Sequence, residues 1–358
     1  MVEIKSEILP ALEQIEKLHK VSREDIIKLI ETSVTNAALK FFGSEYKIIS
    51  EMDLENVKVN TYILKKVVEN VKDEKQEISL QEALNIEPNC KVGDEIKILV
   101  NNEKFFRIAA QLAKKIVVQK LRESYKRNVY EEYCSKIGEL ISSSVYMIKG
   151  KDIILDLDKA EGILPYREQV YKEKLKPGQQ IKVLIKEVHQ KKKGVAVIVS
   201  RFDKNFIKKL FESEIPEIKD KIIEIVNISR APGYRTKIVL KSNNPKVDPV
   251  GSCVGIRGTR IKPIINELQG ERIDLIPYTD NIEKFIAFSL SPWKVDKVEI
   301  VDAEKKIAKA YIPQKIYDAV ADKTNINLNL AKEITGWEIK LEPSKEQQSD
   351  DKKDEKQE

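Results

Sequence analysis

The chain has 358 residues, of which 34% are charged, but its formal net charge is only +6. This length predicts two to four domains, and the small net charge means that any attraction to nucleic acid must come from local basic patches. Cys90, Cys134 and Cys253 are too widely spaced for a disulfide framework or a C-x-x-C metal site. No apolar run approaches the roughly 20 residues that span a bilayer, and the acidic start does not resemble a signal peptide. We therefore expect a soluble cytoplasmic protein without a membrane partner.

Residues 1–129 are predicted to form an α/β domain that opens with a helix over residues 8–19. Ser22 is expected to cap a second helix, since the apolar pattern starts just after it. Short strands are expected over residues 57–68, 77–84 and 95–100. No glycine or proline lies between residues 107 and 137, which predicts a long helix there. Its apolar face is expected to carry Ile108, Leu112, Ile116, Val117 and Leu121. This helix is expected to project from the first domain and separate it from the next.

Residues 130–200 change to short apolar stretches separated by turns that are rich in glycine and lysine. The five candidate strands cover residues 138–148, 152–157, 162–165, 180–188 and 194–199. Five short strands of this kind are typical of an OB-type β-barrel.

Residues 201–279 contain the tetrapeptide Gly255-Ile256-Arg257-Gly258, a G-x-x-G loop. Glycines can adopt positive φ and let another backbone approach closely. A polar-apolar strand pattern over residues 235–240 precedes the loop, and a helical pattern and a second strand follow it. This order of elements is that of a KH domain, which clamps about four nucleotides at its G-x-x-G loop.

The sequence around this loop is strongly basic. Between residues 226 and 266 the only acidic residue is Asp248, whereas the basic residues are Arg230, Arg235, Lys237, Lys241, Lys246, Arg257, Arg260 and Lys262. We assign Arg257, Arg260 and Lys262 to backbone phosphates, which supply most of the affinity for nucleic acid. Arg235, Lys237 and Lys241 share the polar face of one strand, which either contacts RNA or is merely solvated. Val254 and Ile256 either support unstacked bases or pack in the core.

Residues 280–342 repeat the KH pattern loosely and predict a second KH domain. Helices are expected over residues 285–290, 315–320 and from Asn327, and strands over residues 295–301 and 337–341. The last segment, residues 343–358, offers almost no apolar side chain to bury, so we expect it to be disordered.

The barrel offers three further candidate RNA contacts. Lys192 lies in a basic turn over residues 191–194, and Arg201 follows the last strand. Such a charge run either contacts RNA or is a solvated turn. Tyr146 is a candidate stacking platform, and so is Tyr166, although aromatic residues are only 6% of the chain and stacking is expected to be weak.

Nine short segments along the chain form a recognisable series. They are RIAAQ at 107–111, QKLRE at 119–123, VSR at 199–201, FESEIPEI at 211–218, DPVG at 248–251, VGIRGTR at 254–260, INEL at 265–268, AFSLSP at 287–292 and LAKEITGW at 330–337. These segments resemble the bacterial NusA family of transcription termination/antitermination factors. They cover most of the chain from Arg107 onward, in order. The first hundred residues match only in outline.

The resemblance implies an N-terminal domain that docks on RNA polymerase beside the RNA exit channel. It further implies an S1-type barrel and two KH domains that hold the emerging single-stranded transcript. Such a factor favours pausing and intrinsic termination and joins antitermination complexes with other Nus factors. The implied fold class is a multidomain α+β chain: an α/β N-terminal domain with a linker helix, an S1-like OB barrel and tandem KH domains.

The chain departs from the family in its second KH domain. Alignment on Gly336-Trp337 places Asp322-Lys-Thr-Asn325 where the family carries a second G-x-x-G. A carboxylate repels phosphate, and a threonine does not easily adopt positive φ. The first loop is therefore expected to be the principal RNA clamp.

Two other classes of protein remain open. Asp152, Asp156 and Asp158 include two carboxylates on one strand face, as a metal-dependent nuclease requires. We favour a polar strand face of the barrel instead, because no further acidic cluster or histidine accompanies them. His19 and His189 have no neighbouring nucleophile or second ligand, and neither a P-loop nor a Rossmann fingerprint is present. We therefore expect a non-enzymatic protein without cofactor or metal.

The alternatives are an RNA-processing enzyme with its catalytic domain in residues 1–129, and a ribosome assembly factor. Nothing indicates a coiled coil, and we expect a monomer.

Overall fold

The computed structural model describes residues 23–53, 58–320 and 325–344. The chain divides into two compact units, residues 1–132 and 133–358. Three predicted features lie outside the described residues: the helix over residues 8–19, the cap of the second helix at Ser22, and the tail from residue 345.

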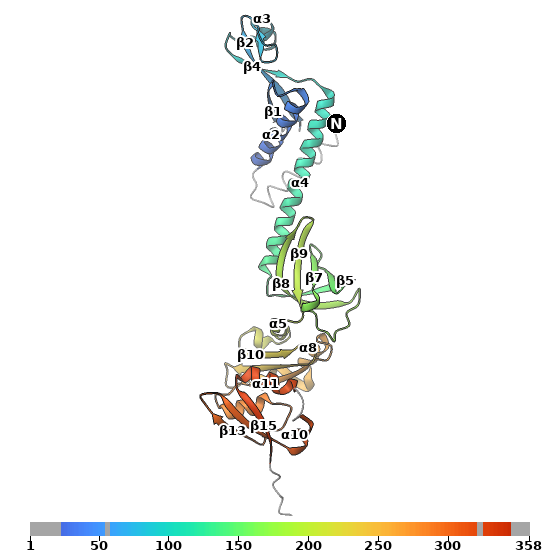
Figure 1. The fold of residues 1–358 in the computed structure, drawn as a ribbon. Coiled ribbons are helices and arrows are strands. Elements are labelled where there is room, and N and C mark those ends of the chain that lie inside the picture. The colour runs from blue at the N-terminus through green and yellow to red at the C-terminus, as the bar shows by residue number, and fades with distance from the viewer. Residues whose placement is uncertain (1–22, 54–57, 321–324, 345–358) are drawn as a thin grey trace, which may run out of the picture. The chain divides into compact units, whose positions relative to one another are not determined.

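The first unit is built around a four-stranded sheet (Figure 1). Its elements are α2 (Arg23–Phe42), β1 (Lys47–Asp53), β2 (Lys58–Val68), β3 (Glu77–Ser79), α3 (Leu80–Ile86), β4 (Glu95–Leu99) and the long helix α4 (Glu103–Ser135). The strand β2 is central, because β1 and β4 pair with it antiparallel and β3 pairs with it parallel. The long strand predicted over residues 57–68 and the predicted long helix are thus confirmed.

Helices α2 and α4 contribute to one core through residues spaced four apart. The buried residues of α2 are Ile26, Ile30, Val34 and Ala38, and those of α4 are Phe105, Ala109, Ala113 and Val117. The predicted apolar face of α4 is wrong at Ile108, which is 42% exposed, whereas Val117 is buried as predicted. Small alanines pack in the core here, and the larger aliphatic stripe lies at its margin, where Leu112, Ile116 and Leu121 are partly buried.

The strand predicted over residues 77–84 is also wrong beyond its third residue, because α3 starts at Leu80. The Ser79 hydroxyl accepts a hydrogen bond from the Glu82 amide at 3.4 Å and donates one to the Glu82 carboxylate at 3.1 Å. A serine followed three residues later by glutamate is a capping box, which starts a helix. That signal was present in the sequence and outweighs the alternating pattern.

The second unit begins with a closed five-stranded barrel in the order β5-β6-β7-β9-β8 (Figure 1). Its strands are β5 (Leu140–Lys149), β6 (Asp152–Asp156), β7 (Glu161–Leu164), β8 (Gln180–Lys191) and β9 (Gly194–Ser200), with a short 3₁₀ turn η1 (Tyr166–Glu168) before β8. Inward residues alternate along the strands; Val197 and Val199 of β9, for example, are fully buried. All five predicted strands, and with them the OB-type barrel, are confirmed.

A KH fold follows the barrel. Its elements are α5 (Lys204–Glu214), α6 (Pro216–Lys219), β10 (Ile223–Ala231), β11 (Arg235–Ser242), α7 (Pro249–Val254), η2 (Ile256–Gly258), α8 (Ile261–Glu267) and β12 (Arg272–Pro277). In its sheet, β11 pairs antiparallel with β10 and parallel with β12. Ile238 and Leu240 of β11 point to the helices α5, α7 and α8 and form the core with them.

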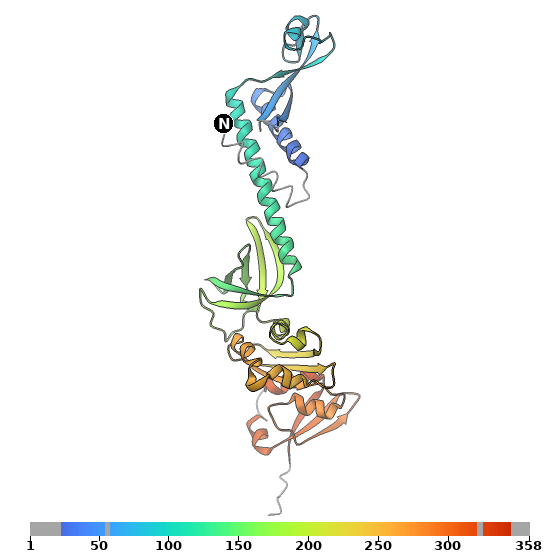
Figure 2. The ribbon, with the colours of Figure 1, turned by 180° about the vertical axis from the view of Figure 1, so that it is seen from behind.

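The second KH fold repeats this topology. Its elements are α9 (Ile282–Ser289), β13 (Lys297–Asp302), β14 (Ile307–Ile312), α10 (Gln314–Val320), α11 (Ile326–Thr335) and β15 (Glu338–Pro343), and β14 again pairs antiparallel with β13 and parallel with β15. Val239 of β11 and Ile276 of β12 pack against Ile334 of α11 and Phe285 of α9. The first KH sheet is therefore covered on both faces, with α11 against one of them (Figure 1) and helices of its own fold on the other, which is seen from behind in Figure 2.

Candidate nucleic-acid interface

The G-x-x-G loop between α7 and α8 adopts backbone conformations that favour glycine. Gly255 has φ 71° and ψ 172°, Gly258 has φ 77°, and Arg257 between them is also left-handed at φ 55°. The amides of Gly258, Thr259 and Arg260 donate to carbonyls within the loop and α7. The helix α8 has Pro263, without an N–H, in its first turn. Side chains and the exposed loop backbone, more than free helix amides, are thus available to a phosphate.

The start of α7 is built by Asp248, a residue whose role the sequence reasoning missed. Its two carboxylate oxygens accept hydrogen bonds from the amides of Val250 at 3.1 Å and Gly251 at 3.0 Å. A Cβ on Gly251 would lie 2.4 Å from the Asp248 carboxylate, so this tight cap requires glycine. Aspartate directly before a proline at the first helical position is the signal that could have revealed the cap.

Arg260 fixes the loop to its surroundings. Its guanidinium donates to both carboxylate oxygens of Glu217, at 2.8 and 2.9 Å, and to the carbonyl of Ser252 at 2.9 Å. The hydrogen bond from Arg260 lowers the pKa of Glu217. Arg260, predicted as a phosphate ligand, is thus already neutralised by a carboxylate, and its first role is to hold the loop against α6.

The two glycines should differ in their tolerance of alanine. A Cβ on Gly255 would lie 2.8 Å from Cγ of Arg260, whereas one on Gly258 would meet nothing closer than Lys262 Cε at 3.6 Å. Gly255 also lies in a backbone region that costs other residues about 1–3 kcal/mol. We expect Gly255→Ala to lower the free energy of unfolding more than Gly258→Ala, as measured by urea denaturation. Equal losses would contradict the close approach of Arg260.

Cys253 lies in α7 directly beneath the loop and is fully buried. Burial raises the pKa of its thiol to about 12, so almost no thiolate exists near neutral pH, and the thiolate is the reactive form. We expect iodoacetamide at pH 8 to modify the partly exposed Cys134 in the folded protein and to reach Cys253 only after unfolding, as followed by peptide mass spectrometry. Equal modification rates for the two cysteines would contradict this packing.

Three predicted RNA ligands are available at the loop. Ile256 is 84% exposed at its tip, and the side chains of Arg257 and Lys262 are exposed. Within residues 23–53, 58–320 and 325–344, neither cation has a hydrogen-bond or ion-pair partner. An apolar tip flanked by two uncompensated cations suits a sugar-phosphate backbone with an unstacked base. Val254 is half-buried, one residue before the loop.

The predicted basic strand face of β11 is not a free surface. The Lys237 ammonium is fully buried, 2.9 Å from the Asp274 carboxylate and 2.7 Å from the carbonyl of Ser291, and burial lowers its pKa. The Arg235 guanidinium contacts Asp274 at 3.3 Å and the side chain of Asn327 at 3.1 Å. Both side chains point towards the second KH fold, which covers this face. The prediction that Lys237 binds RNA is therefore wrong, and the guanidinium of Arg235 is largely engaged by Asp274 and Asn327.

Lys241, at the end of the same strand, is exposed, and its ammonium lies 5.0 Å from the ring centroid of Tyr278. It is therefore the member of the predicted basic face that stays accessible. The structure thus separates three residues that the sequence placed on one surface.

Arg201 is fully buried between the barrel and the first KH fold, so its assignment to RNA is also wrong. Its guanidinium donates to both carboxylate oxygens of Glu173 at 2.6 and 2.7 Å, to the carboxylate of Glu267 at 2.6 Å and to the Lys182 carbonyl at 2.5 Å. Glu173 and Lys182 belong to the barrel, whereas Glu267 ends α8. Arg201 therefore joins the two folds.

The other barrel candidates are exposed but apart from the loop. Tyr146 is 68% exposed at a β-bulge in β5, and Lys192 is exposed in the hairpin between β8 and β9. Lys151 lies 5.4 Å from the ring centroid of Tyr166. No hydrogen bond, ion pair or ring contact among the described residues joins Tyr146 or Lys192 to the KH loop.

Most of the divergent loop of the second KH fold, residues 321–324, lies outside the described residues. The loop ends at Asn325, whose side chain accepts a hydrogen bond from the Asn327 amide at 2.9 Å and caps α11.

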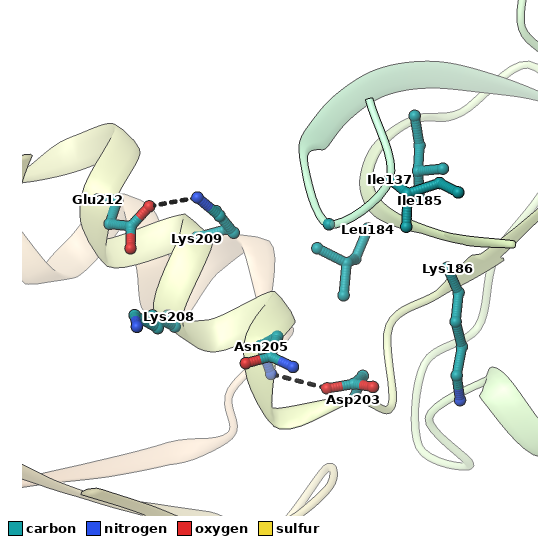
Figure 3. A pocket seen from close by; sticks show the side chains of 10 residues that line it. Ile137, Leu184, Ile185, Lys186, Asp203, Asn205, Lys208, Lys209 and Glu212 are labelled. Carbon is teal, nitrogen blue, oxygen red and sulfur yellow. Dashed lines mark hydrogen bonds and ion pairs between the residues drawn. The ribbon is translucent and has the colours of Figure 1, made fainter. Parts of the chain in front are cut away.

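A pocket of about 310 Å³ lies between the barrel and α5 (Figure 3). Leu184 and Ile185 form its apolar side, and α5 supplies Asn205, Lys208 and Lys209. Lys209 is 2.7 Å from Glu212, its neighbour on the same helix. Among the lining residues no nucleophile pairs with a base, so the pocket provides no catalytic arrangement.

These features define a class of protein. An OB-type barrel joined to tandem KH folds, with a glycine loop that presents free cations, is the architecture of a multidomain RNA-binding protein. No helix in the described part of the chain has the length and apolar character needed to cross a membrane.

The comparisons with known proteins identify the family. Family models match for the NusA N-terminal domain at residues 7–127, the NusA-like first KH domain at residues 201–278 and the NusA-like second KH domain at residues 282–349. The transcription termination/antitermination protein NusA of Bacillus subtilis is 38% identical over 94% of this chain and 90% of its own length. The protein of that name from Halalkalibacterium halodurans is 36% identical over 96% of this chain and 90% of its own length. A solution structure of the N-terminal domain of NusA from B. subtilis is 38% identical, covers 34% of this chain and 97% of its own, and gives a TM-score of 0.31. The chain belongs to the NusA family.

Proposed function

We propose that the chain is an RNA-binding transcription elongation factor that docks on bacterial RNA polymerase near the RNA exit channel. There it holds nascent single-stranded RNA and so modulates pausing, intrinsic termination and antitermination, the last together with other Nus factors. Family membership supports the role in transcription. The observation that carries the RNA-binding part is the loop at Gly255 to Gly258, where Arg257 and Lys262 are exposed cations without partners in the described residues.

The site supports binding and not a chemical step. Asp248, the acidic residue nearest the loop in sequence, is occupied as a helix cap, and Glu217 is occupied by Arg260. Close to the loop, Arg260 and Glu217 neutralise each other, and the two exposed cations Arg257 and Lys262 outnumber the single carboxylate of Asp248. We propose that the protein acts in the cytoplasm as a monomer and without a cofactor.

The experiment that tests this proposal is co-purification of the tagged full chain with RNA polymerase and with ribosomal subunits, from bacterial lysate treated with nuclease. Recovery of polymerase in stoichiometric amount supports the proposal, whereas recovery of ribosomal subunits alone would establish an assembly factor. Incubation of the pure protein with RNA and Mg²⁺ tests the alternative of an RNA-processing enzyme. An elongation factor leaves the RNA intact, whereas defined cleavage products would indicate an enzyme.

A further inference from the structure

The helix α8 connects the G-x-x-G loop to the interior of the second unit. It starts three residues after Gly258 and carries Lys262 in its first turn. Ile264 in its middle is fully buried, and Leu268, directly after its last residue, is 1% exposed; both belong to a core that also contains Leu184 of the barrel strand β8. A short helix packed in this way is a rigid element. Displacement of its far end therefore also displaces the loop.

The barrel holds the far end of α8. The carboxylate of Glu267, the last residue of α8, accepts hydrogen bonds from the backbone amide of Lys182 in β8 at 3.0 Å and from the Arg201 guanidinium at 2.6 Å. The same guanidinium donates to the main-chain carbonyl of Glu267 at 2.7 Å. Lys182 belongs to the barrel and Arg201 directly follows its last strand. The end of α8 is thus fixed by groups outside its own fold.

The donor that holds Glu267 has a fixed position of its own. Arg201 also donates to both carboxylate oxygens of Glu173, and the two side chains are only 0% and 3% exposed. Glu267 therefore meets a guanidinium that the barrel has already oriented. The Glu267 side chain itself is 22% exposed, so its replacement removes the contact without opening a cavity in the centre of the core.

The near end of α8 is held within the KH fold. Arg260 directly precedes α8, and its guanidinium binds both carboxylate oxygens of Glu217 in α6. The loop helix is thus fixed at two points, by Arg260 to its own fold and by Glu267 to the barrel. Only the second of these depends on the neighbouring fold.

We propose that Glu267 is a positioning residue for RNA binding, through which the barrel sets the position of α8 and of the G-x-x-G loop. Glu267 acts through the helix and does not contact RNA. A binding site keeps its affinity only when supporting contacts hold it within about 0.5 Å of the productive geometry. This inference rests on the proposed function, since it concerns the affinity of the same loop for RNA.

The test measures binding of a fluorescent single-stranded RNA to the full chain and to Glu267→Ala, Glu267→Gln and Glu214→Ala. Glu214 is the matched control, because it ends α5, which does not carry the loop, and its carboxylate contacts the ammonium of the same barrel residue, Lys182, at 2.8 Å. Removal of a negative charge by itself favours binding of a polyanion. On charge alone, all three variants should therefore bind at least as tightly as wild type.

The positioning role predicts the opposite sign for one variant. Glu267→Ala should weaken RNA binding about 3- to 30-fold, and the slope of log affinity against log salt should stay that of wild type, because no phosphate ligand is lost. Glu267→Gln keeps an oxygen that can accept from Lys182 and Arg201, so it should bind at least as tightly as wild type. Glu214→Ala should do the same.

Hydrogen exchange followed by mass spectrometry provides a second readout that needs no RNA. The amides of Gly258, Thr259 and Arg260 donate to carbonyls within the loop and α7. They should exchange faster in Glu267→Ala, whereas α5 and the KH sheet should exchange as in wild type. Faster exchange throughout the second unit would indicate a general loss of stability and would contradict the positioning role. Glu267→Asp keeps the charge, shortens the side chain and should show the same local changes; it replaces Glu267→Ala if that variant does not fold.

The outcomes separate this inference from the proposed function. Wild-type affinity and wild-type loop exchange in Glu267→Ala would overturn the inference and leave the proposed function intact. Tighter RNA binding by Glu267→Ala would also overturn it, because charge alone would then explain the effect. If the wild type binds no RNA, the proposed function fails, whereas faster loop exchange in Glu267→Ala would still support the control of the loop position by Glu267.

Discussion

Replacing both Arg257 and Lys262 by alanine is expected to weaken binding of single-stranded RNA and to flatten its dependence on salt. Each phosphate contact to a single strand contributes about 0.7 to the slope of log affinity against log salt, so loss of two contacts should lower that slope by about 1.4. Both side chains are exposed beside the loop, so the fold should be unaffected. Fluorescence anisotropy between about 50 and 200 mM salt measures both quantities.

The control for this experiment is the double variant Lys28→Ala/Lys40→Ala, which removes two exposed lysines from α2 in the first unit. That variant should keep the wild-type slope in binding to free RNA. An unchanged slope in the loop variant would show that the phosphates are bound elsewhere.

Arg201→Ala is expected to have the largest effect on stability. It would leave the buried carboxylate of Glu173 without its charge partner and remove the contact from the barrel to Glu267. Breaking a buried ion pair on one side typically costs about 3–5 kcal/mol. Chemical denaturation should show this loss in the second unit, and adding Glu173→Gln should restore part of it, because a neutral amide is less costly to bury.

Arg127→Ala provides the matched control. Arg127 forms an ion pair with Glu131, and both side chains are largely exposed. Exposed pairs of this kind contribute at most about 1 kcal/mol. Comparable losses for Arg127→Ala and Arg201→Ala would contradict the role of Arg201 as the buried link between barrel and KH fold.

The barrel and the KH loop were predictable because their signals are local. Alternation of apolar residues marked each of the five barrel strands, and the glycines at 255 and 258 occupy the left-handed conformations that their chemistry favours. The helix start at Ser79 has an equally local signal, a serine followed three residues later by glutamate, although the residues around it also alternate as in a strand.

The roles of the basic residues were not predictable, because they depend on distant carboxylates. Arg201 meets Glu173 and Glu267, which lie 28 and 66 residues away in the sequence. Lys237 lies on a polar strand face that would be solvated in an isolated KH fold, but the second KH fold covers it and Asp274 neutralises it. A basic residue in a strand thus indicates a partner, and only the packing shows whether that partner is RNA or protein.

The central claim is tested most directly by transcription with purified bacterial RNA polymerase on a template that carries a hairpin pause and an intrinsic terminator. Addition of the wild-type chain should lengthen the pause and raise the terminated fraction, and the Arg257→Ala/Lys262→Ala variant should do so less. Identical pause lifetimes and terminated fractions with and without the wild-type chain would contradict its assignment as an elongation factor that holds nascent RNA.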